Sequence, residues 1–301
     1  MKTSIALCTY NGGKYLKEQL ESILAQTVLP DEIVVCDDGS TDDTKNITEQ
    51  YRQIYPLIFK VFNNEKNLGY AKNFEKAITL CTGDLIFLSD QDDVWKKNKI
   101  EVMRNTAEQN PEIHVFAHRI EILEKNGDVL SQSFWDIDGF NPNSANSETL
   151  KYLLFERNVF PGMSLAITRN AREKYLPLKS PHQLVIHDYE IILKSCRDNA
   201  FKAIDESLTL YRTHENQNIG FNKNFVPTNE LKPTDIYINI NKIAFIKKMV
   251  ISFNLSKTLI EEYREKCRSD YKKFIKNMGF PKNWIIHLKM KYYYKVLHEI
   301  R

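Results

Sequence analysis

The sequence lacks the features that define several protein classes. No apolar run approaches the ~18 residues that a membrane-spanning helix needs. The five cysteines are scattered and form no Cys-x-x-Cys pair, which argues against a zinc site. No secretory apolar region follows Met1-Lys2-Thr3, and a net charge of +3 is too small to indicate nucleic acid as a partner. We therefore expect a cytoplasmic protein with reduced cysteines.

The composition is that of an ordinary globular protein, with 42% hydrophobic and 27% charged residues among 301. Over the first ~110 residues, short apolar runs at 4–7, 33–36, 59–62 and 85–88 alternate with segments whose apolar positions recur at helical spacing. This alternation predicts an α/β fold with a mostly parallel sheet covered on both faces.

The pattern changes after residue 110. We expect strands at 115–117 and 120–123, a hairpin turn at Asn126-Gly127, and a loop at 136–146, which is rich in Asn, Asp, Gly, Pro and Ser. A strand at 164–168, a helix at 188–196 and a short strand at 208–212 follow, and only helical patterns appear from 234 onward. We divide the chain into a domain at 1–220, with halves 1–110 and 111–220, and a helical extension at 221–301.

In an open parallel sheet, ligands bind beyond the carboxyl ends of the strands. Polar or acidic residues follow each of the first four predicted strands, so they are expected to converge on one rim. After the fourth strand, Asp90 and Asp92 are two residues apart and can point to the same side. Carboxylate oxygens suit Mg²⁺ or Mn²⁺, with a diphosphate completing the coordination shell. The alternative is that Asp92 or Asp93 caps the next helix.

The first two strand ends carry weaker signals. Gly39 permits a turn, and Asp38 can accept hydrogen bonds from a base or a ribose hydroxyl, whereas Ser40 or Asp42 is expected to cap the next helix. The segment 9–11, Thr-Tyr-Asn, can contact a nucleoside or form a plain turn between strand and helix.

Two later groups of residues are also candidates. Asp188, after His187 at a loop-to-helix junction, is either a general base for an acceptor hydroxyl or a helix cap. Arg212 and His214 follow the last predicted strand, where they either face phosphates or a metal or form a surface turn.

Taken together, these motifs resemble those of family 2 glycosyltransferases. The motifs are the segments 8–12 (CTYNG), 37–42 (DDGSTD), 67–69 (NLG) and 83–95 (GDLIFLSDQDDVW), in this order. The resemblance covers roughly residues 1–215 and implies the GT-A fold, a nucleotide-binding α/β domain that continues into an acceptor-binding half. The last motif is similar to that of rhamnosyltransferase-like members, which implies dTDP-rhamnose as a donor, with a UDP-sugar as the alternative.

The resemblance also implies roles for individual residues. Asp188 would be the catalytic base, and Asp92 and His214 would hold Mg²⁺ or Mn²⁺. Further candidates are Asp93, Trp95, His187 and Arg212. The donor nucleotide would be bound by Thr9, Tyr10, Asn11, Asp38, Gly39, Asn67, Gly69, Asn73, Asp90 and Gln91.

Two departures from the family pattern matter. Many members carry Glu-Asp at the base motif, where this sequence has His187-Asp188. The Gln-x-x-Arg-Trp signature of processive synthases is missing, so we expect single sugar additions to a glycan or lipid-linked acceptor in surface polysaccharide synthesis. A nucleotidyltransferase and a non-catalytic nucleotide-sugar-binding module stay open as alternatives.

The segment 272–301 is basic and contains interleaved aromatic residues. Such a segment can lie on an anionic membrane surface, which predicts a peripheral location on the inner face of the membrane. The alternative is a solvated helical face packed on the main domain.

Overall fold

The computed structural model describes residues 1–130, 132–215 and 235–277. The chain divides into two compact units, Met1–Asn222 and Lys223–Arg301. The first unit contains a mixed sheet that holds all the strands among the described residues. All five cysteines are described and are free thiols.

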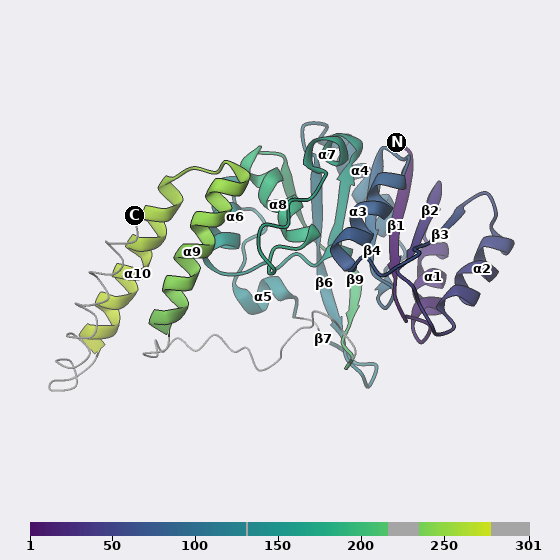
Figure 1. The fold of residues 1–301 in the computed structure, drawn as a ribbon, viewed down its shortest axis with the longest axis horizontal. Coiled ribbons are helices and arrows are strands. Elements are labelled where there is room, and N and C mark those ends of the chain that lie inside the picture. Colours follow the sequence, from purple (N-terminus) through teal and green to yellow (C-terminus); the bar gives the residue numbers. More distant parts are fainter. Residues whose placement is uncertain (131, 216–234, 278–301) are drawn as a thin grey trace. The chain divides into compact units, whose positions relative to one another are not determined.

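Four parallel strands form one half of the sheet (Figure 1). They are β1 (Thr3–Thr9), β2 (Glu32–Asp37), β3 (Phe59–Asn63) and β4 (Leu85–Ser89), in the spatial order β3-β2-β1-β4. Every residue of β1, β2 and β4 is buried, because helices cover both faces of the sheet. The expected parallel arrangement is confirmed, and the four carboxyl ends point to the same edge.

The sheet continues through strands of mixed direction. Next to β4 lies antiparallel β8 (Leu165–Thr168), followed by β6 (Val115–Leu123), β9 (Phe201–Arg212) and β5 (Val94–Trp95). The short β7 (Val129–Leu130) pairs with β6 as the expected hairpin. Because β9 runs parallel to β6, its end lies near the carboxyl end of β4, where β5 pairs with it.

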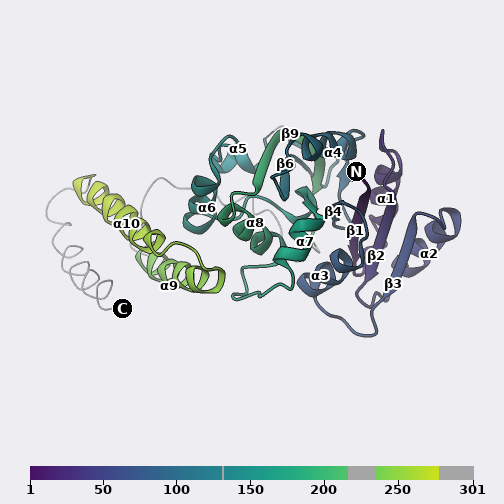
Figure 2. The same ribbon diagram turned by 90° about the horizontal axis from the view of Figure 1, so that it is seen from above.

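Helices cover the two faces of the sheet (Figure 2). On one side lie α1 (Leu16–Leu24), α2 (Thr44–Ile54) and α4 (Lys99–Gln109). On the other side lie α3 (Tyr70–Leu80), α7 (Arg169–Tyr175) and α8 (His187–Arg197). The main core between strands and helices includes Leu7, Leu20, Val35, Phe87 and Ile100, all fully buried.

Two strand predictions for the second half need correction. The segments 115–117 and 120–123 are one strand, because pairing with β9 continues through an irregularity at the polar residues His118 and Arg119. The expected short strand at 208–212 is the end of the longer β9.

The predicted loop at 136–146 is also partly wrong, because α5 (Phe134–Asp138) occupies its start. Ser133 and Asp136 form a capping box around the first turn of this helix, and Gly139 ends it in a left-handed conformation with φ +66°. After the connection, α6 (Asn146–Phe155) begins, and the 3₁₀ helix η1 (Gly162–Ser164) precedes β8.

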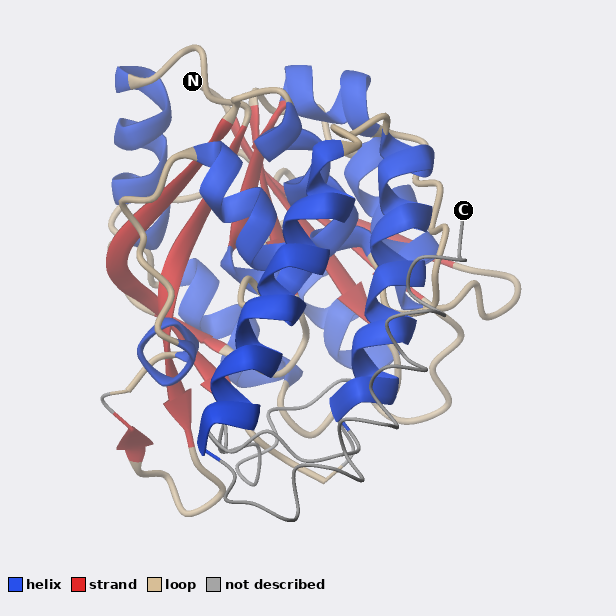
Figure 3. Ribbon diagram, turned by 90° about the vertical axis from the view of Figure 1, so that its left-hand side faces the viewer, coloured by secondary structure: helices blue, strands red, loops and turns tan. Residues whose placement is uncertain are grey.

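In the second unit, α9 (Asp235–Phe253) and α10 (Thr258–Asn277) pack side by side (Figure 3). Ile246, Met249 and Phe253 of α9 are buried, as are Leu259 and Tyr263 of α10. Within the described residues, none of the helices has the length and apolar character needed to cross a membrane. Most of the basic, aromatic segment, from residue 278 on, lies outside the described residues.

Candidate active site

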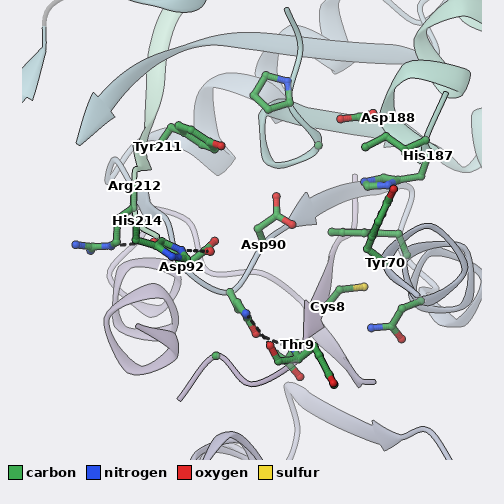
Figure 4. A pocket seen from close by; sticks show the side chains of 18 of the residues that line it. Cys8, Thr9, Tyr70, Asp90, Asp92, His187, Asp188, Tyr211, Arg212 and His214 are labelled. Carbon is green, nitrogen blue, oxygen red and sulfur yellow. Dashed lines mark hydrogen bonds and ion pairs between the residues drawn. The ribbon is translucent and has the colours of Figure 1, made fainter. Parts of the chain in front are cut away.

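A pocket with a volume of about 1210 Å³ opens at the carboxyl ends of β1, β2 and β4. The residues after these strands line one side, together with the start of α3. The loop before η1, the start of α8 and the end of β9 line the other side. Segments far apart in the sequence therefore meet at one site (Figure 4).

Most of the predicted site residues line this pocket. They are Thr9, Tyr10, Asn11, Asp38, Asn67, Gly69, Asn73, Asp90, Gln91, Asp92, His187, Asp188, Arg212 and His214. Gly39, Asp93 and Trp95 are not in the lining. Gly39 instead supplies a turn with φ +88°, and Trp95 is buried against Phe87.

Asp92 and His214 lie together at one end of the pocket. Oδ2 of Asp92 is 2.7 Å from Nε2 of His214. Nε of Arg212 donates to the backbone oxygen of Asp92, and the backbone N–H of Arg212 donates to the buried carboxylate of Asp93. Neither Asp92 nor Asp93 is the helix cap considered above, because Asn98 occupies the N-cap position of α4. The end of β9 therefore fixes the turn that carries both aspartates.

The chemistry of this pair fits a divalent cation that is shared with a substrate. Among the described residues, no group of three His, Cys, Asp or Glu side chains is arranged to hold a metal by itself. A carboxylate oxygen and an imidazole nitrogen supply two ligands for Mg²⁺ or Mn²⁺, which leaves positions for phosphate oxygens and water. Tyr15 packs beside His214, with ring centroids 5.0 Å apart, and limits where that ring can lie.

Asp90 lies between Asp92 and Asp188 in the pocket (Figure 4). Burial, together with the negative charges of Asp92 and Asp188, raises the pKa of Asp90 to about 8. Three carboxylates in one hollow repel one another, so the pocket favours a cation or a ligand that brings one. The acidic character of the site thus depends on two segments, the turn after β4 and the start of α8.

Asp188 is held at the first turn of α8 with its side chain almost fully buried, at 4% exposure. Its Oδ1 accepts the backbone N–H of Tyr189 at 2.5 Å. Burial raises the pKa of Asp188 to about 7, although the backbone N–H groups of Tyr189 and Gly162 partly offset this effect. It does not occupy the N-cap position, which is Ile186. A carboxylate with this pKa is suited to accept a proton near neutral pH.

Side-chain hydrogen bonds hold the ends of the strands together at the pocket. The amide of Gln91 clamps Tyr10, since Oε1 accepts its N–H at 2.8 Å and Nε2 donates to its carbonyl at 3.1 Å. Oδ1 of Asn11 accepts the N–H of Thr41, which ties the first strand end to the second. A side chain at Gly12 would collide with Gln91, since a Cβ there would lie 2.0 Å from Oε1.

The second strand end is fixed by two adjacent aspartates. Asp37, to which the sequence analysis gives no role, accepts the hydroxyl of Thr9 and the N–H and hydroxyl of Ser40. Asp38 accepts the backbone N–H groups of Leu68 and Gly69 at 2.8 and 2.9 Å.

Asn73 completes this network by donating to the carbonyl of Cys36 and accepting from Asn64, whose amide also donates to Asp38. The predicted nucleotide-binding residues therefore also position one another.

Comparison with known proteins identifies the family. The family model for glycosyl transferase family 2 matches residues 4–176 of the chain. The chain belongs to this family.

Curated relatives and solved structures agree with this assignment. A dTDP-rhamnosyl transferase of Shigella flexneri, RfbG, is 29% identical over 236 residues, which cover 73% of this chain and 75% of the relative. An uncharacterised glycosyltransferase of Nostoc is 29% identical over 219 residues, which cover 65% of that relative. The chain therefore spans just under two thirds of the relative's length.

Among solved structures, S. aureus TarS in complex with UDP-GlcNAc has a TM-score of 0.60 at 20% identity, covering 95% of this chain and 79% of that chain. A mannosyltransferase of Pyrobaculum calidifontis, in complex with GDP-Man and Mn²⁺, has a TM-score of 0.55 at 13% identity, covering 99% and 83%. These likenesses show the GT-A fold. The predictions of family and fold are confirmed, and the match favours glycosyl transfer over the two alternatives left open.

The pocket of this family 2 glycosyltransferase also contains residues to which the sequence analysis gives no role. Tyr70, Phe74, Phe134, Gly162 and Tyr211 line the pocket. Phe134 and Tyr211 meet edge to face, with ring centroids 5.4 Å apart. Phe134 is missed because it lies in the helix that was not predicted, whereas Tyr70 directly follows the predicted segment 67–69 and was within reach of the sequence.

A buried carboxylate organises the loop before Asp188. Glu190 accepts the backbone N–H groups of Lys179 and Ser180, both at 2.7 Å, and pairs with Lys194 at 2.6 Å. Ser180 has a positive φ of +40°, an uncommon conformation for a residue with a side chain. Gln183 and Leu184 of the same loop line the pocket, so Glu190 fixes the segment that leads to Asp188.

Proposed function

We propose that this chain transfers a single sugar, with inversion, from a nucleotide-sugar donor to a hydroxyl of a glycan or lipid-linked acceptor in surface polysaccharide synthesis. The observation that carries the proposal is the convergence of two features in one pocket. The Asp92–His214 pair can share a cation with a diphosphate, and Asp188 is a buried carboxylate whose pKa is about 7. Such a pairing suits displacement of a charged leaving group by a neutral hydroxyl.

Asp92 and His214 would hold Mg²⁺ or Mn²⁺. When bound, the metal stabilises negative charge on the diphosphate leaving group. Arg212 fixes the turn of Asp92 through its backbone oxygen, and it also pairs with Glu18 at 2.5 Å. These contacts hold the metal-binding carboxylate in place before a donor arrives.

Asp188 takes the part of the general base. An acceptor oxygen forms the new bond to the anomeric carbon, and its proton passes to the carboxylate of Asp188. The bond between that carbon and the diphosphate oxygen breaks at the same time, and its electron pair leaves with the nucleoside diphosphate. Attack opposite to the leaving group inverts the configuration at the anomeric carbon.

Two kinds of donor are supported. The similarity to a rhamnosyl transferase favours dTDP-rhamnose, and the similarity in fold to a protein solved with UDP-GlcNAc favours a UDP-sugar. We assign the recognition of the nucleotide to Thr9, Tyr10, Asn11, Asp38, Gly39, Asn67, Gly69, Asn73, Asp90 and Gln91. Gly39 would act through its turn, because it lies outside the pocket lining.

The test is a donor screen. The protein is incubated with Mn²⁺ and each sugar nucleotide in turn, and the released nucleotide is identified by chromatography. Slow release of a nucleoside diphosphate from one donor, dependent on the metal, is the expected result. Release of pyrophosphate, or neither binding nor turnover with any donor, contradicts the proposal.

We also propose a cytoplasmic location with peripheral membrane contact through the basic segment at 272–301. A liposome flotation assay with anionic lipids compares the full chain with a form that ends at Asp270. Flotation of the full chain alone is expected, whereas equal behaviour of the two forms rejects the membrane contact.

A further inference from the structure

His187 differs from an ordinary core histidine in its hydrogen bonding. It is 4% exposed, and within the described part of the chain neither ring nitrogen has a hydrogen-bond partner. His118 is equally buried, at 1%, but its Nδ1 lies 2.6 Å from the carbonyl of Arg119 and its Nε2 3.3 Å from the hydroxyl of Thr209. Buried polar atoms nearly always have partners, so the unmet capacity of His187 requires an explanation.

The position of His187 suggests that a ligand provides the partner. Its ring stacks on Phe74, with centroids 4.1 Å apart and 15° between the planes, and both residues line the pocket. Gly162 borders the Nε2 edge of the ring, where a Cβ would lie 2.8 Å from Nε2. The ring therefore has an aromatic residue on one face and a glycine at its Nε2 edge, next to the base Asp188.

The ring is uncharged at physiological pH, because burial lowers the pKa of His187 to about 3. A neutral imidazole has one N–H donor and one nitrogen acceptor. A hydroxyl group can either donate a hydrogen bond to one ring nitrogen or accept one from the other, so it is a suitable partner. An ionised phosphate can only accept a hydrogen bond, and it forms no ion pair with an uncharged imidazole. The chemistry therefore favours a sugar hydroxyl over the diphosphate.

We propose that His187 is a specificity-determining residue that hydrogen-bonds a hydroxyl of the transferred sugar once the donor is bound. This inference rests on the proposed function. His187 lies across the pocket from Asp92 and His214, with Asp90 between them (Figure 4). A donor whose diphosphate is held at Asp92 and whose anomeric carbon faces Asp188 brings its sugar beside His187. Both nitrogens are shielded from water in the unliganded protein, so binding includes a small shift of the ring or of Gly162.

The experiment uses the full chain with His187→Phe, which keeps an aromatic ring against Phe74, and His187→Leu, which removes the ring. We expect both variants to unfold at or above the temperature of the parent when unliganded, because each removes buried polar atoms without partners. The control is His118→Phe. This substitution leaves the hydrogen-bond partners of His118 without a partner, so it should lower the unfolding temperature.

Ligand measurements complete the test. In both His187 variants, the rise in unfolding temperature given by Mn²⁺ with the nucleoside diphosphate alone should equal that of the parent. The extra shift given by the whole sugar nucleotide should be lost, and kcat/KM for its turnover should fall about tenfold. The preference between donors that differ at one hydroxyl should weaken.

Two results overturn the inference. One is retention of the sugar-dependent shift and of the donor preference in both variants. The other is a loss of unliganded stability, or a failure to fold, as severe as in His118→Phe, which would make His187 a structural residue. Failure of the proposed function itself is distinct, because the parent protein would then give no shift with Mn²⁺ and any nucleoside diphosphate.

Discussion

Asp92 and His214 are 122 positions apart in the sequence, yet Oδ2 of one lies 2.7 Å from Nε2 of the other. The contact exists because β9 runs beside β6 and ends next to the turn that follows β4, where β5 pairs with it. Side chains from the two halves of the domain thus meet at the pocket.

The first prediction concerns this pair. Asp92→Asn and His214→Ala each remove one proposed metal ligand, so we expect turnover of the donor to fall about 100-fold. The rise in unfolding temperature given by Mn²⁺ with a nucleoside diphosphate should fall in parallel. Titration calorimetry measures the loss of binding directly. The matched control is Asp84→Asn, at the amino end of β4 and outside the pocket lining, where the carboxylate accepts the N–H of Lys2. Equal effects in all three variants would contradict the assignment of the metal ligands.

A second prediction concerns the pH dependence of the reaction. Only the ionised form of Asp188 can accept the proton, and its pKa is about 7, so kcat/KM should rise with pH and level off above this value. Asp188→Asn should lower turnover by about 10²–10⁴-fold while donor binding persists. A pH–rate profile and a donor titration check these points. Parallel loss of binding and turnover would remove the role of Asp188 as base.

The same pKa has a consequence for stability. The pKa of Asp188 is raised in the folded state from 3.8 to about 7, so the folded state binds the proton more tightly than the unfolded chain. Its stabilising contribution is complete below about pH 4 and is lost as the pH rises through 7. Compared with the parent, unliganded Asp188→Asn should therefore gain on the order of 3 kcal/mol of stability between pH 5 and pH 8. Urea unfolding at both pH values measures this difference, and a constant offset between the two proteins would count against a raised pKa.

The loop before the base gives a fourth prediction. Glu190→Gln removes a charge that Lys194 and two backbone N–H groups share, so we expect a stability loss on the order of 3 kcal/mol and a fall in turnover. Glu32 is the matched control, since it also accepts a backbone N–H, from Thr82, and a lysine, Lys60, but lies outside the pocket lining.

Glu32→Gln should reduce stability and leave the turnover per folded molecule unchanged. In the double variant Glu190→Gln/Lys194→Met, the buried ammonium that loses its carboxylate partner is also removed, so part of the stability should return without the turnover. If Glu190→Gln and Glu32→Gln affect turnover equally, the loop has no special part in positioning the base.

The sequence predicts the first half of the domain well, for a physical reason. Each βα connection is short, so strand, turn and helix are adjacent in the sequence. Ligands of such sheets bind at the carboxyl ends of the strands, which places Asp38, Asp90 and Asp92 at one edge of the sheet. The structure brings all three to the pocket. Trp95 shows the limit of motif-based inference, because its conspicuous place after the acidic motif reflects packing in the core.

The second half depends on contacts that span long stretches of sequence. Composition at 136–146 indicates a loop, but the capping box of Ser133 and Asp136 starts a helix just before it, and Arg119 of β6 bonds both residues. Local propensity carries no information about that partner. The contact between Phe134 and Tyr211 likewise spans a long stretch of sequence, because Tyr211 lies on β9, which pairs with β6.

The most direct test of the account is the position of the metal. A crystal of the protein with Mn²⁺ and a nucleoside diphosphate locates the ion by its anomalous scattering. We predict a peak between the carboxylate of Asp92 and Nε2 of His214, with the two side chains separated to admit the ion and the diphosphate completing its coordination. A peak at another position, with the hydrogen bond between Asp92 and His214 intact, would contradict the account.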